Sequence, residues 1–212
     1  MYIGRKDLSG EAHLTESNLI DRARRRDETA WEILVNEHQQ AAFRLAYLLL
    51  GDVHEAEDAA QEAFIRAYGA LDRFDTSRPF RPWLLRITAN LARNRYRASA
   101  RYLSAIQRLI RLQPVTAASP ASPGGLSGGN GVSHDYAKRE ETHMLWQAVR
   151  RLNPAEQEIV YLRYFLDMPE AETAQALEIA IGTVKSRLHR ALNRLRTIVE
   201  REYPALREMV KG

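Results

Sequence analysis

The stretch EIAIGTVKSRLHRALNRLR, residues 178–196, has the pattern of a turn followed by an amphipathic helix. At about 100° per residue, one sector of that helix is apolar, formed by Val184, Leu188, Ala191 and Leu195. The opposite sector carries short polar groups flanked by cations: Gly182, Ser186, His189 and Asn193 beside Lys185 and Arg190. No acidic residue occurs from 179 to 199, although a merely solvated face would commonly pair Glu with Lys. The pattern favours a basic face that binds a partner over one that is only solvated.

The preceding residues predict two further helices. In NPAEQEIVYLRYFL, residues 153–166, Asn153 can cap a helix, Pro154 suits its first position, and Glu156 can bond back to the cap. The predicted buried positions of this helix are Ala155, Ile159, Leu162 and Leu166. The segment MPEAETAQAL, residues 168–177, predicts a short helix, which a turn of three or four residues joins to the basic helix in a helix-turn-helix unit.

The last helix of such a unit can enter the DNA major groove. Lys185, Ser186 and His189 are suited to base edges. The cations better placed for phosphates are Arg187, Arg190 and Arg194. Many helical hairpins have similar spacing, so this unit alone indicates DNA binding without specifying a family.

Composition limits the classes of protein that remain. The chain has 212 residues, of which 45% are hydrophobic, and it contains no cysteine, which excludes disulfides and thiolate metal sites. Its first residues lack the apolar core of a signal peptide, and no apolar run approaches the ~20 residues that span a bilayer. We therefore expect a cytoplasmic protein without membrane insertion, and no motif indicates a cofactor.

Charge is unevenly distributed along the chain. Residues 76–134 hold nine arginines and no acid, so the remainder of this +4 chain is net negative. Upstream, five acids fall within residues 52–62. The basic block predicts a polyanionic partner, and the acidic segment predicts either a different partner or none.

A Gly/Ser/Pro-rich segment divides the sequence. SPASPGGLSGGNGVS, residues 119–133, has five glycines, two prolines and no charge, a composition typical of a flexible linker. Helical periodicity lies on both sides, without a convincing strand pattern. The sequence predicts an all-α protein with two small domains, residues 15–102 and 137–203, of four helices each. Residues 103–136 form the predicted linker.

In the first domain, GDVHEAEDAAQEAFIRAYGALDRF, residues 51–74, predicts a helix with Asp52 and Glu55 in a reciprocal cap. One face is small and apolar: Ala56, Ala60, Ala63, Ala67 and Leu71. The other face displays Asp58, Gln61, Glu62 and Ile65. His54, Asp58 and Glu62 also lie at four-residue steps, which would suit a helical metalloenzyme. That alternative lacks the Glu-x-x-His pairs that bundle metal sites use.

The next helix is predicted in FRPWLLRITANLARNRYR, residues 80–97. Its apolar sector contains Leu84, Ile87, Thr88 and Leu91. Across from them lies a polar stripe, Arg86, Asn90, Arg93 and Arg97, bracketed by Trp83 and Tyr96. Arginines can hold phosphates while planar side chains stack on unpaired bases, so the stripe suits melted or single-stranded DNA. The alternative is a solvated basic face with Trp83 packed inside.

Taken together, AEDAAQEAF, FRPWLLRITANLARNRYR, the linker, LNPAEQEIVYLRYF and GTVKSRLHRAL resemble bacterial RNA polymerase sigma factors. The resemblance is to the short, two-domain extracytoplasmic-function (ECF) type and covers residues 17–101 and 140–197. It implies that the chain binds RNA polymerase core and directs promoter-specific initiation. The implied partners are the β′ clamp coiled coil and β flap of polymerase, promoter DNA and an anti-sigma factor.

The resemblance also assigns residues. Core polymerase would be bound by Asp58, Gln61, Glu62 and Phe64. Melted minus-ten DNA would be held by Trp83, Arg86, Asn90, Arg93 and Arg97, with the loop 75–80 near a flipped base. The minus-thirty-five duplex would be read by Lys185, Ser186, Arg187, His189 and Arg190.

Four positions depart from the family pattern: Asn94, Thr173, Glu178 and Ala180. A glutamate at 178 is strained if the turn requires a positive φ there. A competing interpretation is a helix-turn-helix regulator that does not act as a polymerase subunit, which would leave the arginine stripe without a role. No nucleophile–base pair or phosphate loop is found, so we expect a protein that is not an enzyme.

Overall fold

The computed structural model describes residues 15–111 and 144–203, and every regular element within them is helical. The first part contains α1 (Glu16–Arg24), α2 (Glu28–Leu50), α3 (Val53–Ala70), the 3₁₀ turn η1 (Leu71–Arg73) and α4 (Phe80–Arg111). The second part contains a helical segment at 144–150, α6 (Pro154–Val160), the π-helical turn η2 (Tyr161–Phe165), α7 (Glu170–Leu177) and α8 (Ile181–Glu202). The predicted all-α class with a terminal helix-turn-helix is confirmed.

Helix starts follow the local chemistry that the sequence predicts. Asn153 and Glu156 form a complete capping box at α6, with Pro154 in the first turn. The Asp52 side chain caps α3 by accepting from the Glu55 amide at 2.9 Å. The Glu55 carboxylate instead binds Arg95 at 3.1 Å, so this cap has one arm rather than the predicted two.

The first core lies among α1 to α4. The alanine face of α3 is buried, as predicted, and its small side chains allow α2 and α4 to pack closely on it. Trp31 meets Phe64 and Phe80 edge-on, with ring centroids 6.1 and 6.4 Å apart. These aromatic contacts hold the start of α4 against α2 and α3.

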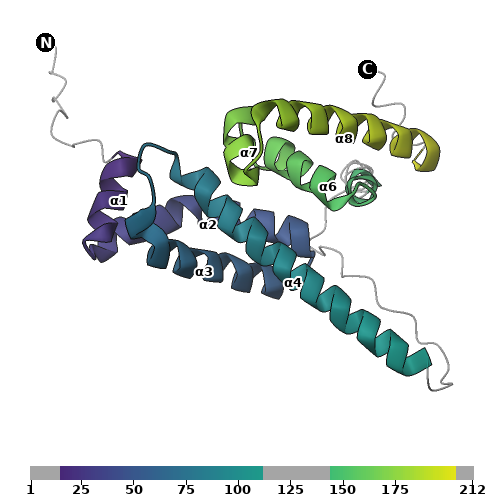
Figure 1. The fold of residues 1–212 in the computed structure, drawn as a ribbon, viewed down its shortest axis with the longest axis horizontal. Helices are drawn as coiled ribbons and strands as arrows, with labels where there is room; N and C mark the ends of the chain where they lie inside the picture. The colour runs from purple at the N-terminus through teal and green to yellow at the C-terminus, as the bar shows by residue number, and fades with distance from the viewer. Residues whose placement is uncertain (1–14, 112–143, 204–212) are drawn as a thin grey trace, which may run out of the picture.

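A second core spans both parts of the chain. Leu45 of α2 and Leu85 of α4 belong to the same buried cluster as Ile159, Leu162 and Val184. Figure 1 shows α7 beside α4, α8 on the outer side of α6 and α7, and the far half of α4 projecting beyond the body. The sequence predicted two domains joined by a linker, and the structure in addition packs them against each other.

Two local features differ from the sequence-based expectation. Ala155 is exposed, because it lies in the first turn of α6 on the solvent side, whereas Ile159, Leu162 and Leu166 are buried as predicted. The helix α4 continues to Arg111, into the segment expected to be linker. Residues 112–143, which include the Gly/Ser/Pro-rich segment, lie outside the described residues.

Candidate nucleic-acid and polymerase interfaces

The helix-turn-helix is closed by an unusual turn. Glu178 ends α7 in the left-handed conformation, with φ of 54°, so the position does require the positive φ that glycine adopts most easily. Ala180 precedes α8 and provides no side-chain cap. The hydroxyl of buried Thr173 donates to the Pro169 carbonyl at 2.9 Å, which satisfies a polar group where the family pattern has an aliphatic residue.

The outward face of α8 is open to solvent. Lys185, Ser186, His189 and Arg190 are exposed, while Val184, Leu188 and Ala191 are buried on the opposite side, as predicted. His189 Nε2 lies 2.9 Å from the amide nitrogen of Asn193, and these two side chains form the polar centre of the face.

Three cations expected on α8 are partly engaged or partly buried. Lys185 is exposed, and its Nζ lies 3.7 Å from the Glu170 carboxylate of α7. Arg187 is half-buried. Arg194 donates to the buried carboxylate of Glu156 at 3.1 Å, which draws it toward α6. The face that could contact base edges is therefore centred on Lys185, Ser186 and His189.

The arginine stripe of α4 is contiguous, as predicted, but much of it faces the chain's own second part. Arg86 pairs with the Glu178 carboxylate. Arg93 donates through Nη1 to both Glu158 oxygens, at 2.8 and 3.0 Å, and through Nη2 to Asn90. Arg97, one turn further along, is exposed.

Glu158 is a buried carboxyl group at this contact, with 4% of its surface exposed. Burial raises the pKa of Glu158, and the opposing attraction of Arg93 offsets only part of that rise. The ion pair is therefore a poor source of net stabilisation, although leaving either charge unpaired there would be costly.

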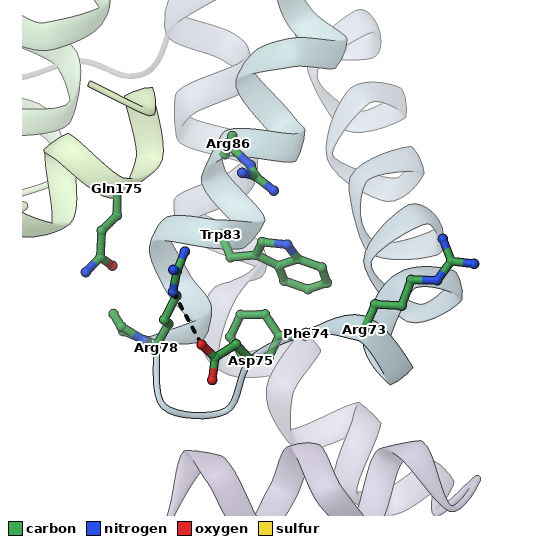
Figure 2. Close-up of a pocket in the computed structure, with 8 residues that line it drawn as sticks. Arg73, Phe74, Asp75, Arg78, Trp83, Arg86 and Gln175 are labelled. Carbon is green, nitrogen blue, oxygen red and sulfur yellow. Dashed lines mark ion pairs between the residues drawn. The ribbon is translucent and has the colours of Figure 1, made fainter. Parts of the chain in front are cut away.

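A small cavity of about 190 Å³ lies where the loop 74–79 meets α4. Figure 2 shows Trp83 lying against Phe74, and their ring centroids are 4.6 Å apart. Asp75 accepts from the Ser77 amide and hydroxyl at 3.0 and 2.7 Å, and these hydrogen bonds lower the pKa of Asp75. Half-buried Trp83 thus serves both the core and the cavity wall, which also includes Arg78 and Arg86.

Comparison with known proteins identifies the two parts. Residues 34–102 match the model of Sigma-70 region 2, and residues 142–195 match that of Sigma-70, region 4. The chain is similar to the ECF RNA polymerase sigma factor SigW of Bacillus subtilis, with 34% identity over 179 residues, 84% of this chain and 92% of that protein. The ECF RNA polymerase sigma-E factor of Escherichia coli K12 is 29% identical over 180 residues, 84% of this chain and 91% of that protein.

The chain belongs to the ECF RNA polymerase sigma factors. The fold agrees, because CnrH, solved in complex with the cytosolic domain of CnrY, superposes with a TM-score of 0.64 at 24% identity, over 88% of this chain and 98% of that one. This sigma factor binds RNA polymerase core and promoter DNA to initiate transcription. Residues 15–111 therefore contain region 2, and residues 144–203 contain region 4.

In this sigma factor, arginines of region 2 itself neutralise part of the acidic face of α3. Asp58 and Gln61 are exposed, as predicted. Half-buried Glu62 accepts from Arg95 at 3.0 Å and from Arg66 at 2.5 Å, and the Arg95 hydrogen bond is the largest cause of its lowered pKa. The most available acids of this face are exposed Glu57 and exposed Asp58, whose carboxylate lies 3.7 Å from Arg95.

Phe64 contributes to the core of region 2, since only 8% of its surface is exposed. Its edge forms part of the floor of a groove of about 770 Å³ between α2 and α3. Ile65 stands beside this groove with 72% of its surface exposed. The groove is lined by Val35, Asn36, Gln39, Gln40, Phe43, Glu57, Ala60, Gln61, Phe64 and Ile65. Sequence reasoning missed the contribution of α2, although its polar residues recur at helical spacing opposite buried Leu34 and His38.

The residues of the metalloenzyme alternative are not gathered into a site. His54 lies 3.9 Å from Glu57, whereas Asp58 and Glu62 face Arg95. Within residues 15–111 and 144–203, no cluster of three or more His, Cys, Asp or Glu side chains could hold a metal ion. In the same ranges, no helix has the length and apolarity needed to cross a membrane.

Proposed function

We propose that this sigma factor divides promoter recognition between α8 and α4. The outward face of α8 reads the minus-thirty-five duplex, with Lys185, Ser186 and His189 toward base edges and Arg190 toward phosphate. The stripe on α4 holds the melted minus-ten strand, and the cavity beside Trp83 and the 74–79 loop receives an unpaired base. The predicted boundaries, 15–102 and 137–203, remain our proposal for the two binding units.

The observation that carries this proposal is an arginine face that adjoins an aromatic-walled cavity in the same chain as a helix-turn-helix. Arg86 lines that cavity and is also a member of the stripe, so one helix offers both a phosphate ligand and a place for a base. A helix-turn-helix regulator acting alone would use α6 to α8 and leave this arrangement unused.

Docking on polymerase core is proposed for the exposed side of α3. Asp58 and Gln61 supply a polar surface, and the adjoining groove with exposed Ile65 supplies an apolar one. We propose the β′ clamp coiled coil as the partner of this surface and the β flap as the partner of region 4. Phe64 acts mainly by supporting the groove from the core.

Three further parts of the proposal rest on the relatives. Both CnrH and the Bartonella quintana sigma factor RpoE were solved with a protein partner, CnrY and the anti-sigma factor NepR respectively. We propose that an anti-sigma factor also holds this chain. We also propose that the chain carries no catalysis of its own and acts in the cytoplasm, where polymerase and chromosome are found.

Run-off transcription with core polymerase on genomic fragments tests the function directly, and gel filtration at moderate salt tests core binding. The double variant Asp58→Ala/Gln61→Ala should bind core more weakly while its melting temperature stays unchanged, because both side chains are exposed. Glu32→Ala, an exposed acid on α2 outside the groove, is the matched control. A wild-type chain that fails to bind core would overturn the proposal in favour of the helix-turn-helix regulator.

A further inference from the structure

The 74–79 loop, which forms one wall of the cavity beside Trp83, is held at its first end by α1. The Arg24 guanidinium donates through Nε to the Leu71 carbonyl at 3.0 Å and through Nη2 to the Phe74 carbonyl. The Asp21 carboxylate, one turn earlier on α1, accepts from Arg24 Nη1 at 2.9 Å and orients the guanidinium. Figure 1 shows α1 beside this connection between α3 and α4. One side chain of α1 thus satisfies two backbone carbonyls at the end of η1.

The other end of the loop is held by α1 as well. Where α4 begins, the Glu16 carboxylate accepts from the Phe80 amide at 3.0 Å. The preceding residue is Pro79, whose side chain has no oxygen that could cap the helix, so the acceptor comes from another helix. The second oxygen of Glu16 lies 3.3 Å from Nε2 of buried His38. His38 and the Phe80 amide lower the pKa of the Glu16 carboxyl more than its burial raises it, so the ionised form is favoured beside the helix start.

Both residues that α1 anchors also support Trp83. The ring centroids of Phe74 and Phe80 lie 4.6 and 5.5 Å from that of Trp83. A shift of either anchored backbone group would therefore move a ring that packs against the indole. The other loop residues that line the cavity lie between the two anchors. The contacts of α1 thus determine where this wall of the cavity stands relative to α4.

These polar contacts differ from the ones that attach α1 to the domain. Leu19 and Ile20 are buried in the first core and supply the apolar attachment. Arg24 and Glu16 bond instead to backbone groups at the two ends of the loop, and so fix its position. The helix α1 lies ahead of residues 34–102, the part of the chain that matches Sigma-70 region 2.

We infer that α1 is a positioning element for base capture, in which Arg24 and Glu16 hold the two ends of the 74–79 loop and thereby set how selectively the cavity accepts an unpaired base. The inference rests on the proposed assignment of this cavity to a base of the minus-ten strand. Both side chains act through the loop rather than by contacting DNA. Their removal should therefore reduce the contribution of the base, while phosphate binding by α4 is retained.

Fluorine NMR of the full chain labelled with 5-fluorotryptophan tests whether α1 positions the loop. The chain has three tryptophans, and single Trp→Phe substitutions assign their resonances. Arg24→Ala should shift or broaden the Trp83 resonance and leave the resonance of Trp146, in region 4, unchanged. Arg25→Ala removes the neighbouring, exposed arginine and is the matched control, which should change neither resonance.

Base capture is measured in the polymerase holoenzyme, with single-stranded oligonucleotides that carry the minus-ten element of a promoter mapped by run-off transcription. In a series that makes each position abasic in turn, the wild type should lose about tenfold in affinity at one position, as expected for one stacked base. In Arg24→Ala the loss at that position should shrink to about threefold or less, because the base is no longer well stacked. A chain that was merely less stable would instead bind every oligonucleotide more weakly and keep the abasic pattern.

The Glu16 anchor is tested in the same series by rescue. Glu16→Ala should flatten the abasic pattern as Arg24→Ala does. Glu16→Gln keeps an oxygen that can accept from the Phe80 amide and should restore the wild-type pattern. Glu28→Ala removes an exposed acid from the first turn of α2 and is the matched control, because it makes the same change at another helix start.

Three results would overturn the inference. An unchanged Trp83 resonance in Arg24→Ala would show that α1 does not position the loop. A changed resonance with a wild-type abasic pattern would show that the position of the loop does not affect base capture. A wild-type series with no sensitive position would overturn the assignment of the cavity to a base, and with it the selectivity assigned to α1, whatever the fluorine spectra show.

Discussion

The basic faces of α8 and α4 look alike in sequence and differ in the folded chain. On α8, Lys185, Ser186 and His189 are exposed. On α4, Arg86 and Arg93 are bound to acids of region 4. The comparison teaches that a stripe of arginines in a sequence indicates an affinity for anions. Whether a partner can bind that stripe depends on whether acids of the same chain already occupy it.

The acids of region 4 explain this asymmetry. No acid lies on α8 between 179 and 199, so its outward face has no internal partner within its own helix. Glu170 of α7 lies 3.7 Å from Lys185 at the edge of that face, whereas the acids of α6 and of the turn are directed away from it. Glu156 turns to Arg194, Glu158 to Arg93, and Glu178 to Arg86. Region 4 thus presents a basic surface to solvent and an acidic one to α4.

The largest effect is expected from the α4 face, where Arg86 and Arg93 are proposed to hold the minus-ten strand. In the holoenzyme, Arg86→Ala/Arg93→Ala should weaken binding of a single-stranded minus-ten oligonucleotide by about 3 kcal/mol, or about a hundredfold, because two charge-assisted contacts are lost. Fluorescence anisotropy measures the change. Arg196→Ala, an exposed cation of α8, should leave this binding intact. Equal losses in both variants would mean that the two faces do not divide the promoter.

On the exposed face of α8, substitutions at base-contacting and phosphate-contacting residues should have different effects on DNA binding. His189→Ala should change the preference among promoter-like duplexes by about 1–3 kcal/mol at one base position. Arg190→Ala should weaken all duplexes similarly and reduce the salt slope by about one, as expected for a phosphate contact. A salt titration of each full-length variant against a small duplex panel measures both. An equal loss of affinity for all duplexes in both variants would show that the α8 face attracts DNA only electrostatically and does not read its sequence.

Glu178 lies in the turn between α7 and α8, where it pairs with Arg86 of α4 and adopts a positive φ. Glu178→Gly should raise the free energy of unfolding by about 1 kcal/mol relative to Glu178→Ala, because only glycine is unstrained in the left-handed conformation. Both variants remove the carboxylate, so their difference isolates backbone strain. Urea unfolding measures it, and equal stability would show that the turn relaxes without cost.

The smallest effect is expected where α8 begins. Ala180 gives this helix no side-chain cap, so Ala180→Ser should stabilise the chain by about 0.5–1 kcal/mol in urea unfolding. Ala98→Ser, at an exposed position within α4, should instead lose a few tenths of a kcal/mol. A destabilising Ala180→Ser would mean that the approach of the turn to α4 leaves no room for a hydroxyl.

Much of the local structure could be predicted from the sequence alone, because helix caps and apolar periodicity act over a few residues. Asn153, Pro154 and Glu156 determine the start of α6, and the alanine spacing of α3 determines which of its faces is buried. The same local logic places Ser186 and His189 on the outward side of α8, opposite Val184 and Leu188. Sequence also showed that the chain would be helical and that it resembles the ECF sigma factors.

Only the tertiary structure decided which of these surfaces meet. Nothing local pairs Arg93 with Glu158, which is 65 residues away, or brings Gln175 to the cavity beside Trp83. Phe64 was expected at a docking surface, yet its large ring lies mainly in the core, where burial of aromatic area is most favourable. Periodicity fixes the direction of a side chain relative to its own helix, while the partner on that side depends on how distant helices pack.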